Sequence, residues 1–304
     1  MESLFVAVGA EVVVSPPTNR DMVQHGTTLA VDGTCLPVKI FYGHVNWLVE
    51  TGVDAIFLPR LISTSPREYI CPKFMGLPDM IAAAFPGQYC FITPLVNLSC
   101  SSRLLRKELE RVGNLLGASP RQTRLAWDEA LAAQKDYQAF LLAGNWPGDY
   151  GKEPGSAVSQ PAEDTHLRIG LLGHSYVIYD RVASMDAVHR LHAMGAKVLT
   201  VDMLPADRTD AQVRRFPKRM FWTSGRRILG AAWEFADMPV DGLIYITAFG
   251  CGTDSLTAEL VERTVRRRSG IPQLILNIDE HTGQAGVVTR LEAFVDMARW
   301  RRGR

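Results

Sequence analysis

Cysteine is the residue type in this 304-residue chain best suited to metal or redox chemistry. Cys35, Cys71 and Cys251 each precede a segment with helix-starting signals, and after the last of them we expect a helix capped by Asp254 or Ser255. A thiol at a helix amino terminus lies at the positive end of the helix dipole, which favours the thiolate, the form that binds metal. These three cysteines are therefore the candidate ligands.

The remaining cysteines and the spacing of all five narrow the kind of site. Cys90 and Cys100 lie within or just after an apolar segment, so we expect both to be small buried hydrophobic residues. The close C-x-x-C pairs of many zinc and haem sites are missing from the sequence. An iron–sulfur cluster accepts scattered thiolates more readily, and three ligands on a cubane leave one iron open to substrate. Spacing alone leaves open a cluster shared by Cys35, Cys71 and Cys251, or unlinked structural or reactive cysteines.

Polar residues that follow two predicted strands could handle protons. His174, after "RIGLLG", could contact a cluster or donate a proton to a bound substrate, or it could only satisfy backbone groups in a turn. Glu280 and His281, in "NIDEHTG", could manage protons near a reduced cluster. Asp279 and Thr282 of the same segment fit helix capping better.

Short β-branched segments alternate with helical periods, which is typical of parallel sheets wrapped by helices. We predict strands at 11–15, 54–59, 88–96, 168–173, 197–202, 241–249 and 272–279. The loops that carry Cys71 and Cys251 then follow equivalent strands at the carboxyl edges of two sheets, where open α/β folds bind ligands. If the two sheets face each other there, the three thiols converge.

An internal repeat indicates two similar halves. The segment "AVGAEVVVS" from Ala7 matches "AMGAKVLTV" from Ala193, and "GVDAIFLP" from Gly52 matches "PVDGLIYI" from Pro239, at nearly one offset. In the second half a strand, a loop and most of a helix precede the match. The first half has no counterpart, so we expect it to lack about twenty residues that would include its N-terminal strand.

These patterns together predict the fold and its divisions. We expect an α/β protein with two flavodoxin-like or Rossmann-like halves built on parallel sheets, the first lacking its N-terminal strand, bridged by long helices. The predicted ranges are 1–100 for the first half, 101–144 for the bridging helices, 145–166 for a linker rich in Gly and Pro, and 167–304 for the second half.

Composition excludes several classes of partner. The chain has 33 Lys and Arg against 32 Asp and Glu, so it has no basic field for non-specific nucleic-acid binding. The amino terminus has no basic leader, and no apolar run reaches the roughly 20 residues that span a bilayer. We therefore expect a cytoplasmic protein with reduced cysteines and no membrane contact. Whether the chain forms a dimer is left open.

Four segments resemble the signature blocks of the acyl-CoA dehydratase activase-related family, which is related to the 2-hydroxyacyl-CoA dehydratase subunits. They are "CLPVKIFYGHV", "YICPKFMGLPDMI", "ITAFGCGTDSLTAELVER" and "LNIDEHTGQAGVVTRLEAFVDM", spread over almost the whole chain. The resemblance implies two flavodoxin-like halves, oxygen sensitivity, and a [4Fe-4S] cluster or a larger double-cubane cluster held by three cysteines. Carried over to this sequence, the three are Cys35, Cys71 and Cys251.

The resemblance also implies a reaction and a partner. In the dehydratases an ATP-dependent activase supplies an electron, and the cluster passes it to a 2-hydroxyacyl-CoA thioester. This chain has no G-x-x-x-x-G-K-[ST] loop, so ATP hydrolysis would belong to a separate activase. The hypothesis is ATP-driven low-potential electron transfer to a small molecule such as an acyl-CoA. The alternatives are a non-enzymatic electron relay or sensor, and a truncated metal-free α/β binding protein.

Overall fold

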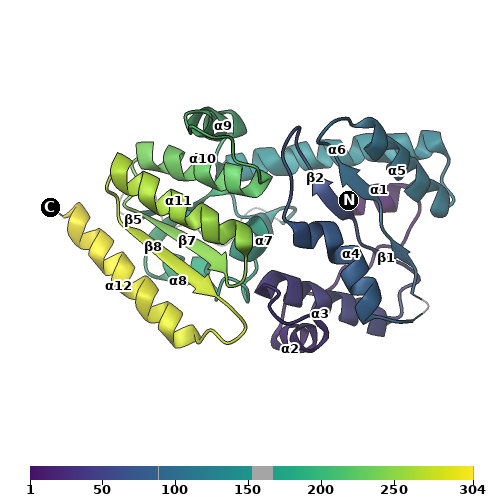
Figure 1. Ribbon diagram of the computed structural model, residues 1–304, viewed down its shortest axis with the longest axis horizontal. Helices are drawn as coiled ribbons and strands as arrows, with labels where there is room; N and C mark the ends of the chain where they lie inside the picture. The colour runs from purple at the N-terminus through teal and green to yellow at the C-terminus, as the bar shows by residue number, and fades with distance from the viewer. Residues whose placement is uncertain (88, 153–166, 304) are drawn as a thin grey trace.

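The computed structural model describes residues 1–304 except 88, 153–166 and 304. The chain forms two halves side by side, with the first half on the right of Figure 1 and the second on the left. Both contain parallel strands and helices, so the predicted α/β class is confirmed. The predicted domain boundaries remain a prediction, and most of the predicted linker, 153–166, lies outside the described residues.

The second half is built on one four-stranded parallel sheet. Its strands are β5 (Leu167–Leu172), β6 (Ala196–Thr200), β7 (Gly242–Ala248) and β8 (Gln273–Ile278). They lie close to four of the predicted strands, and the order β6-β5-β7-β8 is that of doubly wound flavodoxin-like sheets. Every residue of the central strand β7 is buried, because helices cover both faces of the sheet.

Helices pack on both faces of this sheet, as Figure 1 shows. One face is covered by α8 (Ala187–Ala193) and α12 (Gln284–Arg302), and the other by α10 (Thr223–Asp237) and α11 (Gly252–Arg268). The remaining helical segments of this half are α7 (Ser175–Ile178), the 3-10 turn Val201–Met203 and α9 (Ala206–Arg214).

The first half has shorter strands, in two parallel pairs. The pairs are β1 (Ile56–Phe57) with β3 (Phe91–Ile92), and β2 (Arg60–Ser63) with β4 (Leu95–Asn97). The predicted strand at 54–59 is confirmed as β1, whereas 88–96 contains two short strands instead of one, and β2 was not predicted. Around the pairs lie α1 (Glu2–Ala7), α2 (Arg20–Leu29), α3 (Leu36–Thr51) and α4 (Pro72–Ala84).

The predicted strand at 11–15 is wrong. These residues have no strand conformation, and Val13 and Val14 are exposed. Within the described residues no neighbouring strand offers them a backbone ladder, because β1 pairs with β3. A β-branched run without a partner strand cannot satisfy its backbone groups as a sheet.

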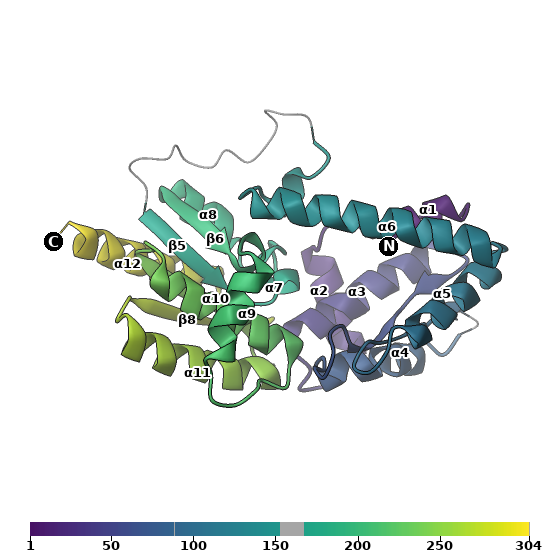
Figure 2. The same cartoon turned by 90° about the horizontal axis from the view of Figure 1, so that it is seen from above.

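Two long helices, α5 (Arg103–Leu115) and α6 (Pro120–Leu142), follow the first half. A capping box between Ser119 and Gln122 starts α6, with Pro120 at its first position. In Figure 2, α6 lies along the first half with α1 beside it, and it also contacts the turn Val201–Met203 of the second half. None of the helices in the described part of the chain is long and apolar enough to cross a membrane.

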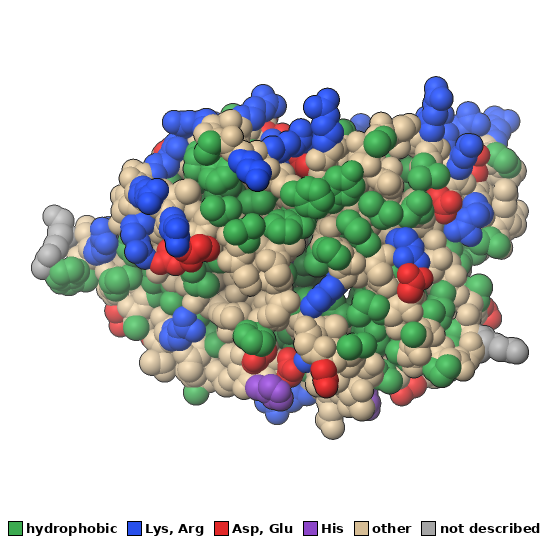
Figure 3. Space-filling view, in the orientation of Figure 1, with side chains coloured by type: hydrophobic (Ala, Val, Ile, Leu, Met, Phe, Trp, Pro, Cys, Tyr) green, Lys and Arg blue, Asp and Glu red, His purple; other side chains and the backbone are tan. Residues whose placement is uncertain are grey.

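The cores of the two halves interlock at α3. Leu36 and Ile40 of α3 pack into the core around β5 and α12, while Ala248 and Cys251 of the second half pack into the core of the first half. Gly26 and Gly43 let α2 approach α3, since a Cβ on Gly43 would lie 2.0 Å from the Met22 carbonyl oxygen. Figure 3 shows hydrophobic side chains gathered across the middle of this face and basic ones along its upper edge.

Candidate metal centre between the two halves

The three candidate cysteines occupy the same local position. Cys35, Cys71 and Cys251 are the N-cap residues of α3, α4 and α11, and no side chain caps these helices. The expected capping of α11 by Asp254 or Ser255 is wrong, because both residues lie inside the helix. Each thiol therefore lies beside backbone N–H groups of the first helical turn and at the positive end of a helix dipole.

The loops that carry these thiols meet between the halves. Cys35 and Cys251 are buried in one cluster, and Cys71 is half-buried. Burial raises the pKa of Cys35, Lys73 lowers it, and the neighbouring thiols of Cys251 and Cys71 raise it further. Burial likewise raises the pKa of Cys71, with a further contribution from Cys251. The thiols of Cys251 and Cys71 thus act on Cys35, and that of Cys251 acts on Cys71, so the three lie close enough to interact.

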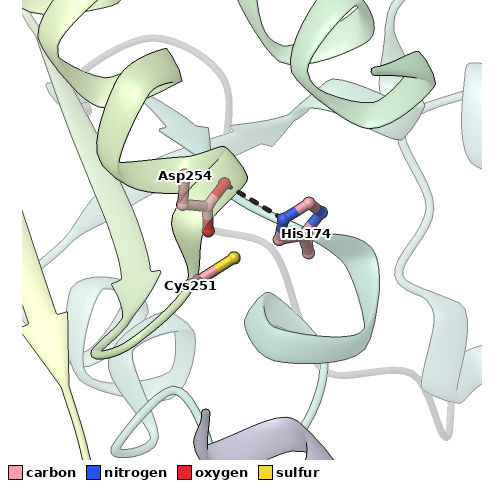
Figure 4. A group of neighbouring side chains, drawn as sticks. All are labelled: His174, Cys251 and Asp254. Atoms are coloured by element: carbon pink, nitrogen blue, oxygen red, sulfur yellow. Dashed lines mark ion pairs between the residues drawn. The ribbon is translucent and has the colours of Figure 1, made fainter. Parts of the chain in front are cut away.

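His174 and Asp254 lie next to Cys251 (Figure 4). The ligand atoms of these three buried residues all lie within 4.8 Å of one another. The His174 Nε2 atom is 3.0 Å from Asp254 Oδ1. The topology explains the meeting, because β5 leads to His174, β7 leads to Cys251, and these strands are parallel neighbours. The sheet order reverses at this point, which is where doubly wound folds bind ligands.

The charges of this group favour an imidazolium beside a thiolate. Burial alone lowers the pKa of His174, but its interactions with Asp254 and Cys251 outweigh burial and raise the pKa to about 9. Burial raises the pKa of Cys251, yet the neighbouring His174 imidazole brings it below the usual value. The Thr253 hydroxyl lies 3.4 Å from the Cys251 sulfur and adds to this effect.

Sequence reasoning missed Asp254 as a functional residue. It is 1% exposed, and Tyr245 donates a hydrogen bond of 3.0 Å to the same oxygen that faces His174. Its Oδ2 atom is buried without a hydrogen-bond partner among the described residues, and the His174 Nε2 atom, although 3.0 Å from Oδ1, is not aligned with it for a hydrogen bond. Buried polar atoms of this kind are rare in folded proteins unless they serve a site. Its place three residues after a helix-starting cysteine was the only local signal.

Aromatic rings from both halves cover the group. Tyr176 stacks on His174 with ring centres 4.9 Å apart and planes 8° apart, and Phe74 meets Tyr176 edge-on at 5.5 Å. Although Tyr176 as a residue is 43% exposed, burial around its hydroxyl and then the charge of Cys251 raise the pKa of that hydroxyl, with smaller contributions from Asp254 and the other two thiols. The phenol of Tyr176 therefore lies beside the converged cysteines.

The residues predicted in "NIDEHTG" have separate environments. Glu280 forms an ion pair with Lys39, one turn after Cys35 on α3, and both side chains are largely buried. The side chain of His281 is 84% exposed. Asp279 accepts hydrogen bonds from the His281 N–H and the Thr282 hydroxyl within the loop, and the N-cap of α12 is Gly283 instead of Asp279 or Thr282. Glu280 therefore joins the two halves.

The prediction that Cys90 and Cys100 are buried is wrong. Both are exposed, and all five cysteines are free. Cys90 precedes the short strand β3 and Cys100 follows β4, so neither lies within the apolar strand that was expected. They lie apart from the helix starts that carry the other three cysteines.

Comparison with known families gives two matches. Residues 1–204 match the family described as CoA enzyme activase uncharacterised domain (DUF2229). Residues 191–298 match the family described as 2-hydroxyglutaryl-CoA dehydratase, D-component. The first range contains Cys35, Cys71 and His174, and the second contains Cys251 and Glu280. No curated protein matches the chain.

Proposed function

Since the chain belongs to the family of the CoA enzyme activase uncharacterised domain, we propose that it is an iron–sulfur protein acting in ATP-driven, low-potential electron transfer. The electron acceptor is a small molecule such as an acyl-CoA, in line with the match to a dehydratase component. The observation that carries this proposal is the meeting of three cysteines at helix N-cap positions, Cys35, Cys71 and Cys251, between the two halves.

The donor set fits an iron–sulfur cluster better than a closed zinc site. Three soft thiolates come from three separate loops, and no fourth cysteine lies at a helix start. The helix dipoles, Lys73 and His174 offset the negative charge that three thiolates bring together. A [4Fe-4S] or double-cubane cluster bound there would supply one-electron transfer.

The other predicted residues take distinct roles in this proposal. His174 lies beside the Cys251 sulfur and orients that ligand. Glu280 holds α3, and with it Cys35, against the second half through Lys39. His281, exposed in the same loop, is the residue left to exchange protons with substrate or solvent.

A separate activase is the proposed partner. The sequence carries no G-x-x-x-x-G-K-[ST] loop, so we assign ATP hydrolysis to another protein. The free cysteines agree with a reducing compartment, and we propose the cytoplasm.

Anaerobic purification followed by iron and acid-labile sulfide analysis tests the shared cluster. We expect iron and sulfide in the reconstituted wild type and a severalfold loss of both in Cys35→Ser, Cys71→Ser and Cys251→Ser. Cys90→Ser is the matched control, because this cysteine is exposed and precedes a strand. Full iron in Cys251→Ser, or none in the wild type, contradicts the proposal and leaves the metal-free binding protein.

Turnover separates an enzyme from an electron relay or sensor. The anaerobic protein is mixed with an activase, ATP and a 2-hydroxyacyl-CoA, and both cluster reduction and acyl-CoA consumption are followed. Reduction with consumption supports the enzyme. Reduction without consumption of any acyl-CoA supports the relay.

A second candidate is a mononuclear metal site formed by His174, Cys251 and Asp254. The close approach of their ligand atoms and the unpartnered Nε2 and Oδ2 atoms favour it. A sulfur, nitrogen and oxygen donor set of this kind suits Zn²⁺ with one open position. Zinc titration of the metal-free protein separates the two candidates. Asp254→Asn would weaken zinc binding while Cys35→Ser would not, whereas a shared cluster depends on Cys35.

A further inference from the structure

Lys73 connects all three cysteine loops. It lies two residues after Cys71, in the first turn of α4. Its Nζ atom donates hydrogen bonds of 3.4 Å to the carbonyl oxygens of Gly33 and Gly250. Gly33 lies two residues before Cys35, and Gly250 directly precedes Cys251. One side chain therefore joins the Cys71 loop to both other loops.

The two carbonyls belong to loops that approach each other backbone to backbone. Gly33 and Gly250 both have a φ of +75°, a left-handed conformation that favours glycine. A Cβ on Gly250 would lie 3.4 Å from the Gly33 carbonyl oxygen and 3.9 Å from the Cys35 Cα atom. Because the two backbone segments lie this close, the carbonyl groups of Gly33 and Gly250 point toward the same position. The Lys73 ammonium group lies at that position.

We infer that Lys73 is a positioning residue that fixes the relative placement of Cys35, Cys71 and Cys251. An ammonium group can donate to two carbonyls at once, and its charge also acts on the Cys35 and Cys71 thiols. The first effect sets the geometry of the loops in the metal-free protein. The second, which rests on the proposed cluster, stabilises the more negative, reduced state of a bound cluster.

Three variants test the inference. Lys73→Met keeps a side chain of similar length but removes the hydrogen-bond donors and the positive charge. Lys73→Arg keeps the donors and the charge. Lys107 is an exposed lysine on α5, and Lys107→Met is the matched control for loss of a lysine away from the cysteine loops. Each is compared with wild type as metal-free protein and after anaerobic reconstitution.

Hydrogen exchange followed by mass spectrometry reports the loops without any cluster. In metal-free Lys73→Met we expect severalfold faster exchange in segments 31–36 and 248–253, with α12 unchanged. Lys73→Arg and Lys107→Met should match wild type. Unchanged exchange of both loops in Lys73→Met overturns the inference.

Anaerobic reconstitution allows the midpoint potential of the cluster to be measured, which a change in loop stability alone would not alter. We expect Lys73→Met to hold severalfold less iron and sulfide, and its remaining cluster to have a more negative midpoint potential than that of Lys73→Arg. An unchanged potential refutes the charge effect. If wild type binds no iron while the loops of Lys73→Met still loosen, the proposed cluster fails and the bridging role stands.

Discussion

Asp254 is the residue on which the buried polar groups of the site depend. One of its oxygens faces His174 Nε2 at 3.0 Å and accepts a hydrogen bond from Tyr245. Because the group is buried, it lies where electrostatic interactions are strong and unpaired charges are costly. The carboxylate pairs with the ring of His174, and the ring in turn lies beside Cys251.

Replacing Asp254 tests this arrangement. We expect Asp254→Asn to lower the free energy of unfolding of the metal-free protein by ~1–3 kcal/mol, because the buried imidazole loses its charged partner. Tyr245→Phe removes only one donor to the same oxygen and should cost about 1 kcal/mol. Urea denaturation measures both. Equal losses in the two variants would mean that the charge of Asp254 adds nothing.

Local signals were enough to find some of these residues and not others. The helix-starting residues that follow Cys35, Cys71 and Cys251 marked these cysteines as candidates. His174 was a candidate because it follows the end of a predicted strand. Asp254 and Lys73 act through contacts with residues far away in the chain, 177 residues away for Lys73 and Gly250. Such contacts follow from tertiary packing, which one sequence does not encode locally.

At the scale of elements, the ends of β5 and β7 set the site. Gly173, directly after β5, has a φ of +151°. A Cβ there would lie 2.7 Å from the Ile246 carbonyl oxygen of β7 and 2.8 Å from Ile178 Cγ2. Only a residue without a side chain lets the chain leave β5 against β7 and place His174 beside Cys251.

A pair of glycine substitutions tests this requirement. We expect Gly173→Ala to lower the free energy of unfolding by about 2–4 kcal/mol through backbone strain and overpacking. Gly76→Ala on α4 is the control, because its Cβ would meet nothing within 4 Å and alanine favours helix, so it should stabilise by ~0.5–1 kcal/mol. Thermal unfolding measures both. Equal stability of Gly173→Ala and wild type would contradict the close approach of the strands.

Helices and strands were predicted correctly where the residues of the segment itself determine its structure. The four strands of the second half and the helices around them follow from period and turn residues. The segment 11–15 shares its pattern with 197–202, and each follows a helix and a left-handed glycine, Gly9 or Gly195. Only the second becomes a strand, because β5 lies beside it. Strand formation depends on the neighbouring backbone more than on propensity.

At the scale of the molecule, the halves are held together around the site. Glu68, 4% exposed, pairs with Arg219 and Arg226 of the second half. Beside it, Tyr69 exchanges backbone hydrogen bonds of 3.1 and 3.0 Å with Phe221 and Thr223, and its ring stacks on Phe221. Together with Lys39 and Glu280, these contacts fix one half against the other.

Removing the charge of Glu68 should loosen this junction. We expect Glu68→Gln to lower the free energy of unfolding by about 3 kcal/mol, because two arginines lose a buried partner. Glu259→Gln breaks an exposed pair with Arg263 on α11 and should cost less than about 0.5 kcal/mol. Denaturation and limited proteolysis between the halves measure the difference. A Glu68→Gln protein as stable as the control would show that the halves hold together without this pair.

The pairing of Lys39 with Glu280 also fixes an order of events during synthesis. The two residues are 241 positions apart, and Cys251 is the last of the three thiols to be made. After Cys35 and Cys71 have been synthesised, the ribosome must therefore translate most of the remaining chain before Cys251 and Glu280 are available to join them and Lys39. A nascent chain that stops short of Cys251 holds Cys35 and Cys71 without their third partner, so a metal that requires all three of these cysteines can be inserted only late in translation or after release.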